Sequence, residues 1–460
     1  MRGPTYPQKP VLSVQPAGPY IKTALSSATR LWILSLNYAP EPMGFAPHAT
    51  ALAEYLAERG HHVTVITGFP FAPQWKRWPE YRGVFSSQAI ENKVAVRRVS
   101  HFIPRRAGAM SQRVAMEASF CLAAALVLLP QLLNRRARPD AVLYIGAQPA
   151  LAMLARWIGA VTRVPYFVNV NDLAAQAAAD VGIVRDGWIQ RVLERVEFAA
   201  YLPSAGASVL CRTFAEALIA KGYLADRIRV IRSPVNLDLV RPVPFRAEYR
   251  EALGLPGGAF VVLFAGSMGL KQGLTNVVEA AHRARDREGD KRPIVWVLVG
   301  DGETRGQLDQ FAKQHELGDA VRLLPFQPAE SMSRMFAAAD VLLLNQLAAV
   351  KNTVIPSKLL TYMAAGRPVL AAVNSSSQGA EILREANGGM LVAPEDPLAL
   401  VRGVEALMSA GPGPLAAMGA RNRAYAEQHF DQRKILAEHE KLILGHLANT
   451  RHRRGTETAA

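Results

Sequence analysis

The chain has 460 residues, of which half are apolar and a fifth are charged, and its formal net charge is +15 at pH 7. This length is too great for one hydrophobic core, so we expect two domains of ordinary size. Its two cysteines are too few for a disulfide framework and suit a reducing cytosol, and the absence of CxxC, HExxH and acidic calcium-loop motifs predicts no structural metal.

Residues 1–29 are rich in Pro, Ser and Thr without an apolar core, which favours a disordered arm over a signal peptide. Beyond them, apolar runs typical of buried strands alternate with helical patterns, for example at 46–59, 277–287 and 331–339. The strand runs lie at 31–37, 63–67, 141–145, 166–170 and 208–211, and then at 260–265, 294–299, 321–324, 341–345 and 369–373. This alternation predicts parallel sheets covered on both faces.

A proline-rich stretch at 233–244 separates the two series of strands and predicts a linker. The expected fold class is therefore α/β, with two doubly wound, parallel-sheet domains that face each other across a cleft. We expect an N-terminal domain at 30–235 and a second domain at 236–430. A helical stretch at 431–450 is expected to pack back toward the first domain.

The positive charge is concentrated in the first domain, where twelve Lys and Arg residues but only three Glu lie between 76 and 138. The apolar run 114–133 is about long enough to cross a bilayer. Glu117 and Pro130 argue against a span. An apolar helix with basic flanks favours contact of 105–138 with an anionic membrane surface, and the alternative is a core helix with incidental arginines. No recognisable nucleic-acid-binding motif is present, so nucleic acid is not an expected partner.

Chemistry is expected beyond the carboxyl ends of the strands. After the first strand, Gly44 would let the backbone approach a ligand, and the helix from about Ala46 offers its N-terminus, although an ordinary loop fits equally well. After the strand at 166–170 comes Asp172. It is either an acid at the cleft or the N-cap of the following alanine-rich helix.

The second domain has four such strand ends in order. GSMGLKQG at 266–273 offers three glycines and Lys271 as a phosphate cradle. The next two strands end in GDGE at 300–303 and in PFQP at 325–328, where the ring of Phe326 could hold a base. Each of these could also be an ordinary surface turn.

The fourth end, IPSKLLTYMAAGRPVLAAV at 355–373, predicts a helix that begins near Pro356 with a Ser357 cap and stops at Gly366, followed by a buried strand. Lys358 lies in the first turn, where the helix dipole disfavours a cation. This placement suggests an anionic ligand, and the alternative is a solvated surface lysine.

These motifs, together with NYAPEPMG and LAERGHHVTVITGFPFAPQW, resemble the family 4 glycosyltransferases of the GT-B fold, and most closely the colanic-acid and capsule type. The resemblance covers about 30–447. It implies a nucleotide-sugar donor in the second domain, an acceptor in the first, retained anomeric configuration, and no metal or other cofactor. The donor-binding residues implied are Gly266, Ser267, Lys271, Gly300, Asp301, Phe326, Thr353, Ser357, Lys358, Leu359 and Thr361. On the acceptor side they are Gly44 and Phe45.

One departure from the family concerns two glutamates eight positions apart, which here are Thr353 and Thr361. A carboxylate at these positions usually holds the donor sugar hydroxyls, so their loss leaves open an altered donor or lost activity. The resemblance favours Asp172 as the catalytic acid, with His48 as the second candidate.

The expected function is transfer of a hexose from a nucleoside diphosphate to a lipid-linked saccharide for surface polysaccharide. The enzyme would be cytoplasmic and peripheral on the inner face of the cytoplasmic membrane. The alternatives are an epimerase or phosphorylase on the same scaffold, or an inactive nucleotide-sugar-binding scaffold.

Overall fold

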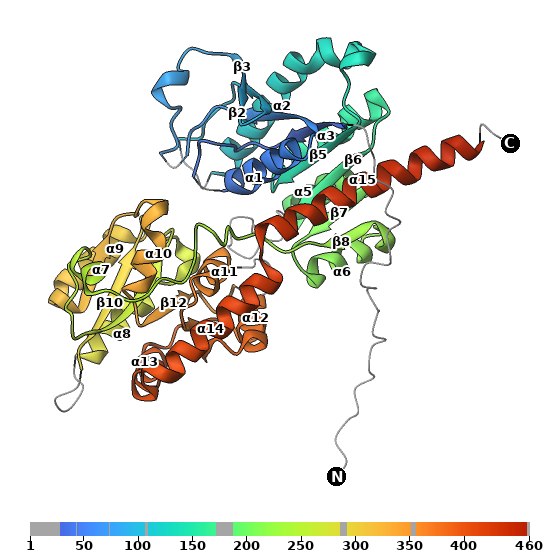
Figure 1. Cartoon of the computed structure of the whole chain (residues 1–460). Helices are drawn as coiled ribbons and strands as arrows, with labels where there is room; N and C mark the ends of the chain where they lie inside the picture. Colours follow the sequence, from blue (N-terminus) through green and yellow to red (C-terminus); the bar gives the residue numbers. More distant parts are fainter. Residues whose placement is uncertain are drawn as a thin grey trace.

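The computed structural model describes residues 28–42, 44–72, 74–105, 109–171, 187–285, 292–350 and 356–457. These residues form two α/β units, each built on its own sheet, with the second unit at the lower left of Figure 1. This arrangement confirms the predicted fold class. Most of the expected N-terminal arm lies outside the described residues.

The first sheet has the strand order β3-β4-β2-β1-β5-β6-β7-β8. All neighbouring strands are parallel except β3, which is antiparallel to β4, so the expectation of a purely parallel sheet is wrong at this edge. The sequence of β3, SSQAIE, is mostly exposed and has no apolar run. The strands are β1 (Arg30–Leu34), β2 (His62–Gly68), β3 (Ser86–Glu91), β4 (Val94–Val99), β5 (Ala141–Gly146), β6 (Tyr166–Val170), β7 (Gly206–Val209) and β8 (Ile228–Val230).

Helices cover both faces of this sheet. One core lies under α2 (Met110–Leu133), α3 (Pro149–Thr162) and α5 (Gly187–Tyr201), and the other lies under α1 (Ala46–Glu58) and the C-terminal helix α15 (Gln432–Glu457). The remaining elements of the first unit are α6 (Arg212–Ala220), η1 (Pro79–Tyr81), η2 (Arg135–Ala137) and η3 (Ala225–Arg227).

The second sheet has the order β11-β10-β9-β12-β13-β14 and is parallel throughout. Its strands are β9 (Phe260–Ala265), β10 (Ile294–Val299), β11 (Val321–Leu324), β12 (Val341–Asn345), β13 (Val369–Ala372) and β14 (Gly389–Val392). Its helices are α7 (Ala247–Glu251), η4 (Leu270–Gln272), α8 (Thr275–Ala284), α9 (Arg305–Gln314), η5 (Gly318–Ala320), η6 (Ala329–Ser331), α10 (Met332–Ala337), α11 (Ser357–Ala364), α12 (Gln378–Ala386), α13 (Pro397–Ala410) and α14 (Pro412–His429).

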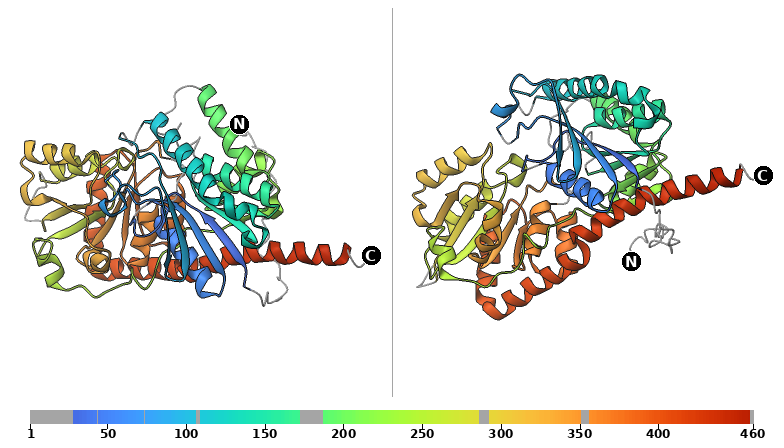
Figure 2. Two further views of the ribbon diagram at one scale, coloured as in Figure 1. Left: turned by 90° about the horizontal axis from the view of Figure 1, so that it is seen from above. Right: turned by 45° about the horizontal axis from the view of Figure 1, so that its top comes forward.

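The chain passes between the units twice, and the two passages meet. The amide of Val235 donates to the carbonyl of Phe430 at 2.8 Å, and the amide of Gln432 donates to Val235 at 3.2 Å. From there α15 runs along the first unit (Figures 1 and 2) and packs against α1 and β7. The C-terminal helix therefore fastens the last part of the chain to the first unit.

Candidate active site

Lys358 lies in the first turn of α11, and its side chain crosses the backbone of Gly266 at the carboxyl end of β9. A Cβ atom at Gly266 would come within 2.3 Å of Lys358 Cε, and φ at Gly266 is +135°. The Lys358 Nζ atom lies 5.2 Å from the centroid of the Phe264 ring. The lysine occupies space that any other residue at position 266 would fill.

Lys271, in η4, shares the surroundings of Lys358. Burial lowers the pKa of Lys358 to about 8, and the positive charge of Lys271 adds to this effect. Two cations near the same point of a partly dry site repel each other, and an anion bound between them would relieve that repulsion. The structure thus brings together the two lysines that the sequence placed at different strand ends.

Asn345, the last residue of β12, supports the η4 turn that carries Lys271. Its Nδ2 atom donates to the carbonyls of Gln272 at 2.8 Å and Gly273 at 2.9 Å, and its side chain is buried. The amide of Leu347 donates to the carbonyl of Lys271 at 3.1 Å. Sequence reasoning did not identify Asn345, although an amide that ends an otherwise apolar strand was a visible signal.

The turn after β10 closes directly on the turn after β9. A Cβ atom at Gly300 would lie 2.0 Å from the Gly266 carbonyl oxygen, and the amide of Met268 donates to the carbonyl of Asp301 at 2.8 Å. Glu303 accepts from the amide of Leu270 at 3.0 Å. The predicted residues Gly300 and Asp301 therefore support the lysine-bearing turn through their backbone.

The other predicted donor-site residues have different environments. Phe326 is 51% exposed just beyond β11. The expected Ser357 cap is wrong, because the hydroxyl makes no capping hydrogen bond and Pro356 is the N-cap residue. The Leu359 side chain is wholly buried in the core, and Thr361 donates from Oγ1 to the Ser357 carbonyl at 3.1 Å.

Ser267 lies at the carboxyl end of β9, between Gly266 and the Met268 amide that the neighbouring turn holds. Thr353 and Asp172 lie outside the described residues.

On the first unit, Gly44 and Phe45 directly precede α1, and φ at Gly44 is +67°. His48 lies in the first turn of α1, and its ring centroid is 5.3 Å from that of His439 on α15. Both ring nitrogens of His48 are buried without a hydrogen-bond partner in the described part of the chain. Burial lowers its pKa to about 4, so the ring is neutral at pH 7.

A half-buried carboxyl group of α2 also lies at this edge of the first sheet. Glu117 accepts from the amide of Ala150 at 3.3 Å in the first turn of α3, which follows β5. Burial raises the pKa of Glu117 to about 7, an effect that this amide and Arg113 partly offset. Sequence reasoning used Glu117 only as an argument against a membrane span.

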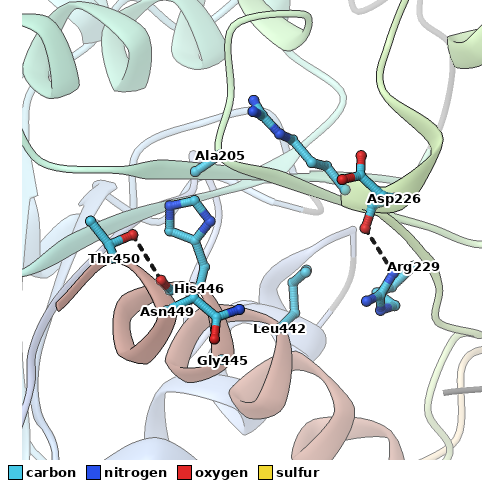
Figure 3. A pocket seen from close by; sticks show the side chains of 9 residues that line it. Ala205, Asp226, Arg229, Leu442, Gly445, His446, Asn449 and Thr450 are labelled. Atoms are coloured by element: carbon cyan, nitrogen blue, oxygen red, sulfur yellow. Dashed lines mark hydrogen bonds between the residues drawn. The ribbon is translucent and has the colours of Figure 1, made fainter. Parts of the chain in front are cut away.

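Two cavities of about 220 and 680 Å³ lie at the opposite edge of the first sheet, where the strands begin. Figure 3 shows the smaller cavity, in which Thr450 donates from Oγ1 to the carbonyl of His446 at 2.9 Å. None of the residues predicted for catalysis or donor binding lines either cavity. We place the candidate active site at the carboxyl ends of the strands, because the paired lysines lie there.

Comparison with known families matches both units in tandem. A "Glycosyl transferase 4-like domain" model matches residues 43–234, and a "Glycosyl transferases group 1" model matches residues 245–425. WcaI of Escherichia coli (strain K12), whose name assigns it to colanic acid biosynthesis as a glycosyl transferase, is 25% identical over 420 residues, covering 89% of this chain and 98% of WcaI. WbjE of Pseudomonas aeruginosa, named as a glycosyltransferase, is 25% identical over 65% of this chain and 73% of its own length.

Solved structures share the same fold. HepE from Anabaena in complex with UDP has a TM-score of 0.66 at 16% identity and covers 90% of this chain and 100% of HepE. WaaG, a glycosyltransferase involved in lipopolysaccharide biosynthesis, has a TM-score of 0.63 at 18% identity and covers 90% of this chain and 100% of WaaG. At these identities the similarity establishes the arrangement of the two units.

Proposed function

We propose that the chain transfers a sugar from a nucleoside diphosphate, because it belongs to the GT-B glycosyltransferases. Its first unit matches the glycosyl transferase 4-like domain, and its second unit matches the glycosyl transferases of group 1. The acceptor would be a saccharide in the synthesis of a surface polysaccharide. The names of WcaI, which refers to colanic acid, and of WaaG, which refers to lipopolysaccharide, support this class of product.

The observation that carries the proposal is that Lys358 crosses the backbone of Gly266 close enough to Lys271 for the two positive charges to interact. When the bond between sugar and diphosphate stretches, negative charge grows on the leaving phosphate. Cations that are already in place stabilise this charge without reorganising, and a partly dry site strengthens the effect. The related fold of HepE has been solved with UDP and with UDP-glucose, which supports the same class of donor here.

The remaining roles extend this proposal. Phe326 would stack on the base, and Thr361, three residues beyond Lys358 on α11, would face the donor sugar in place of a carboxylate. The two lysines supply the positive charge at the diphosphate, so the proposed reaction uses no metal. We further propose that it keeps the anomeric configuration, with Asp172 as the acid or base at the acceptor.

We also propose a lipid-linked acceptor and a peripheral position on the cytoplasmic side of the membrane. The strongly basic first unit supports this location, because anionic lipids concentrate on that side. An epimerase or a phosphorylase would not need such an acceptor. A transferase should release nucleoside diphosphate from the nucleotide sugar only when lipid extract is added, which distinguishes it from both. An inactive scaffold would bind the nucleotide sugar without cleaving it.

Calorimetric binding of UDP and GDP tests the donor site. Lys271→Ala should weaken diphosphate binding by about 1.5 kcal/mol or more, the scale of a charge-assisted hydrogen bond. Lys313→Ala is the matched control, because Lys313 is exposed in the last turn of α9 and paired with Asp309. Unchanged affinity for both nucleotides in the Lys271 variant would remove the argument for a diphosphate site.

A further inference from the structure

Half of the large apolar side chains that the described residues expose gather on three adjacent helices, α2, α3 and α5. Helix α3 packs between the other two, and Figure 2 shows the three on the outer side of the first unit. We call their exposed apolar side chains the apolar face: Val114, Leu122, Leu126, Leu129, Leu133, Trp157, Val161, Trp188, Val192 and Val196. Apolar residues scattered singly over a surface are ordinary, whereas a contiguous patch of this kind marks a contact site.

Helix α2 supplies the longest part of the apolar face. Its inner side, including Phe120 and Leu128, is fully buried in the core, while Leu122, Leu126 and Leu133 are 64%, 57% and 73% exposed. By length and composition α2 is the one described helix that could cross a membrane, but a third of its apolar stretch is buried in the protein. A helix with one side in the core of this fold is not surrounded by lipid, so only its exposed side is free to contact a bilayer.

Helices α3 and α5 extend the apolar face at helical spacing. Trp157 and Val161 are four residues apart on α3, and Trp188, Val192 and Val196 follow the same spacing on α5. The two tryptophans are 41% and 65% exposed. Tryptophan is enriched where a bilayer meets water, because its ring is apolar and its N–H is polar.

The charges around the apolar face have one sign. The exposed arginines on or next to the three helices are Arg113, Arg135, Arg136, Arg163, Arg191 and Arg195. In the described parts of these helices no Asp or Glu is exposed, since Glu117 and Glu194 are half-buried and Glu197 is buried. Two copies of this face would bring arginine toward arginine, whereas an anionic lipid surface complements it.

We propose that the apolar face inserts into the headgroup region of an anionic bilayer, with the axes of α2 and α3 along the membrane plane. This inference extends the proposed function, which needs a lipid-linked acceptor, but it does not depend on catalysis. Glu117 on α2 bonds to the first turn of α3, so this end of both helices meets the carboxyl edge of the first sheet. The acceptor side of the enzyme would therefore open along the membrane surface.

Sedimentation with phosphatidylcholine vesicles, with and without phosphatidylglycerol, tests the proposal on the full chain. The wild-type protein should bind the anionic vesicles. Leu122→Gln/Leu126→Gln/Leu129→Gln should lower the partition coefficient by at least about tenfold, since binding scales with the apolar area inserted. Ile90→Gln/Leu398→Gln is the matched control, because these side chains are 71% and 48% exposed away from the three helices, and it should bind as the wild type does.

Quenching of tryptophan fluorescence by brominated lipid gives a second measurement. Trp157→Phe/Trp188→Phe should bind vesicles but lose the quenching, because Trp32 and Trp296 are buried and Trp75 and Trp78 are half-buried outside the apolar face. UDP affinity should stay unchanged in every variant, so failure at the membrane is distinguishable from failure of the donor site.

Three results would overturn the proposal. The first is equal vesicle binding by the triple Leu variant and the wild type. The second is resistance to alkaline carbonate extraction, which would indicate a true span. The third is a wild-type protein that forms a dimer in solution and does not bind vesicles, together with a triple Leu variant that is monomeric. This result would assign the apolar face to a second copy of the chain.

Discussion

Lys358 carries its charge in surroundings that favour the neutral amine. Its side chain is largely buried over the Phe264 ring, near a second cation, and its pKa falls from 10.5 to about 8. Below pH 8 the folded protein must hold a charge that the unfolded chain solvates better, so Lys358 destabilises the free protein at pH 7. Such a destabilising residue is expected at a binding site, where a bound anion would offset the unfavourable free energy of the buried charge.

We predict that Lys358→Met makes the ligand-free protein more stable at pH 7, by about 2 kcal/mol, while it weakens UDP and GDP binding by about tenfold or more. In the wild-type protein, stability should rise as pH increases from about 8 to 10.5, because the unfolded chain then binds more protons than the folded protein. The Met variant should lack this rise. Urea denaturation across this pH range, with calorimetry at pH 7, measures both effects.

The opposite result for Lys358→Met has a clear meaning. If the Met variant is less stable at pH 7 and binds nucleotide as the wild type does, the lysine is a packing residue rather than a phosphate ligand. Lys313→Met, at an exposed position of α9, is the control for loss of a positive charge alone.

At the scale of elements, the η4 turn depends on the end of β12. Asn345→Asp keeps the size of the side chain but removes the Nδ2 donor that the Gln272 and Gly273 carbonyls use, and it places a carboxylate against them. We expect a loss of about 2–3 kcal/mol of stability, because buried carbonyls lose their donor. UDP affinity should fall as well, because Lys271 is in this turn.

Chemical denaturation and calorimetry of Asn345→Asp check both parts of this expectation. Asn374→Asp is a control at another strand end, since Asn374 follows β13 and is half-buried. If Asn345→Asp lost stability but bound UDP normally, Asn345 would support the sheet without positioning Lys271.

The sequence predicted the elements that are apolar throughout. The strands at 260–265, 294–299 and 341–345 have the bounds predicted from their apolar runs, because a strand buried on both faces carries few polar side chains, and here the one exception is Asn345 at the end of β12. β3 and β14 could not be recognised in this way, since β3 is mostly exposed and β14 is only half-buried. Their positions depend on pairing with a neighbouring strand, which leaves little trace in local composition.

The candidate site was predictable to the extent that topology places strand ends together. Lys271 and Lys358 follow β9 and β12, which are neighbours in the sheet, so their approach follows from the fold. The role of Asn345 could not be predicted, because it depends on which carbonyls lie above it. Likewise, the composition of α2 indicated an apolar helix but could not show that its exposed side is also mostly apolar.

At the scale of the whole molecule, α15 links the two units, and Glu440 is its main polar contact with the first. The Glu440 carboxylate accepts from Arg59, His61 and Tyr55, each at 3.2 Å. The hydrogen bonds to His61 and Arg59 lower the pKa of Glu440 although burial raises it. The stabilisation is therefore present above the ordinary carboxyl range and is lost in acid as pH falls through the lowered pKa.

We predict that Glu440→Ala costs about 2 kcal/mol of stability and increases hydrogen exchange along α15, because the buried His61 ring and the half-buried Tyr55 hydroxyl lose their acceptor. Glu438→Ala removes a carboxylate from the same helix, but one that is exposed and paired only with Lys441. It should cost less than about 0.5 kcal/mol. Equal effects of the two substitutions would mean that Glu440 contributes no more than a surface ion pair.

The last prediction concerns Asp172 and follows from the proposal that the two units have separate roles, donor binding in the second and acid or base chemistry in the first. The donor lysines belong to the second unit, and Asp172 follows β6 of the first. Asp172→Asn should therefore leave UDP affinity unchanged while turnover falls by about a hundredfold, the usual scale for a positioned acid or base. If Asp172 only caps a helix, Asn caps nearly as well, so both rate and stability should survive the substitution.

Sugar transfer and nucleotide affinity measured on the same Asp172→Asn preparation separate these outcomes. A parallel loss of affinity would mean that the variant disturbs the donor unit, and the rate would then say nothing about the acid. Near-normal turnover would assign Asp172 to the helix cap and direct attention to His48. The ring of His48 lies against His439 and is neutral at pH 7, so it could act as a base only after α1 and α15 shift to open a path to the acceptor.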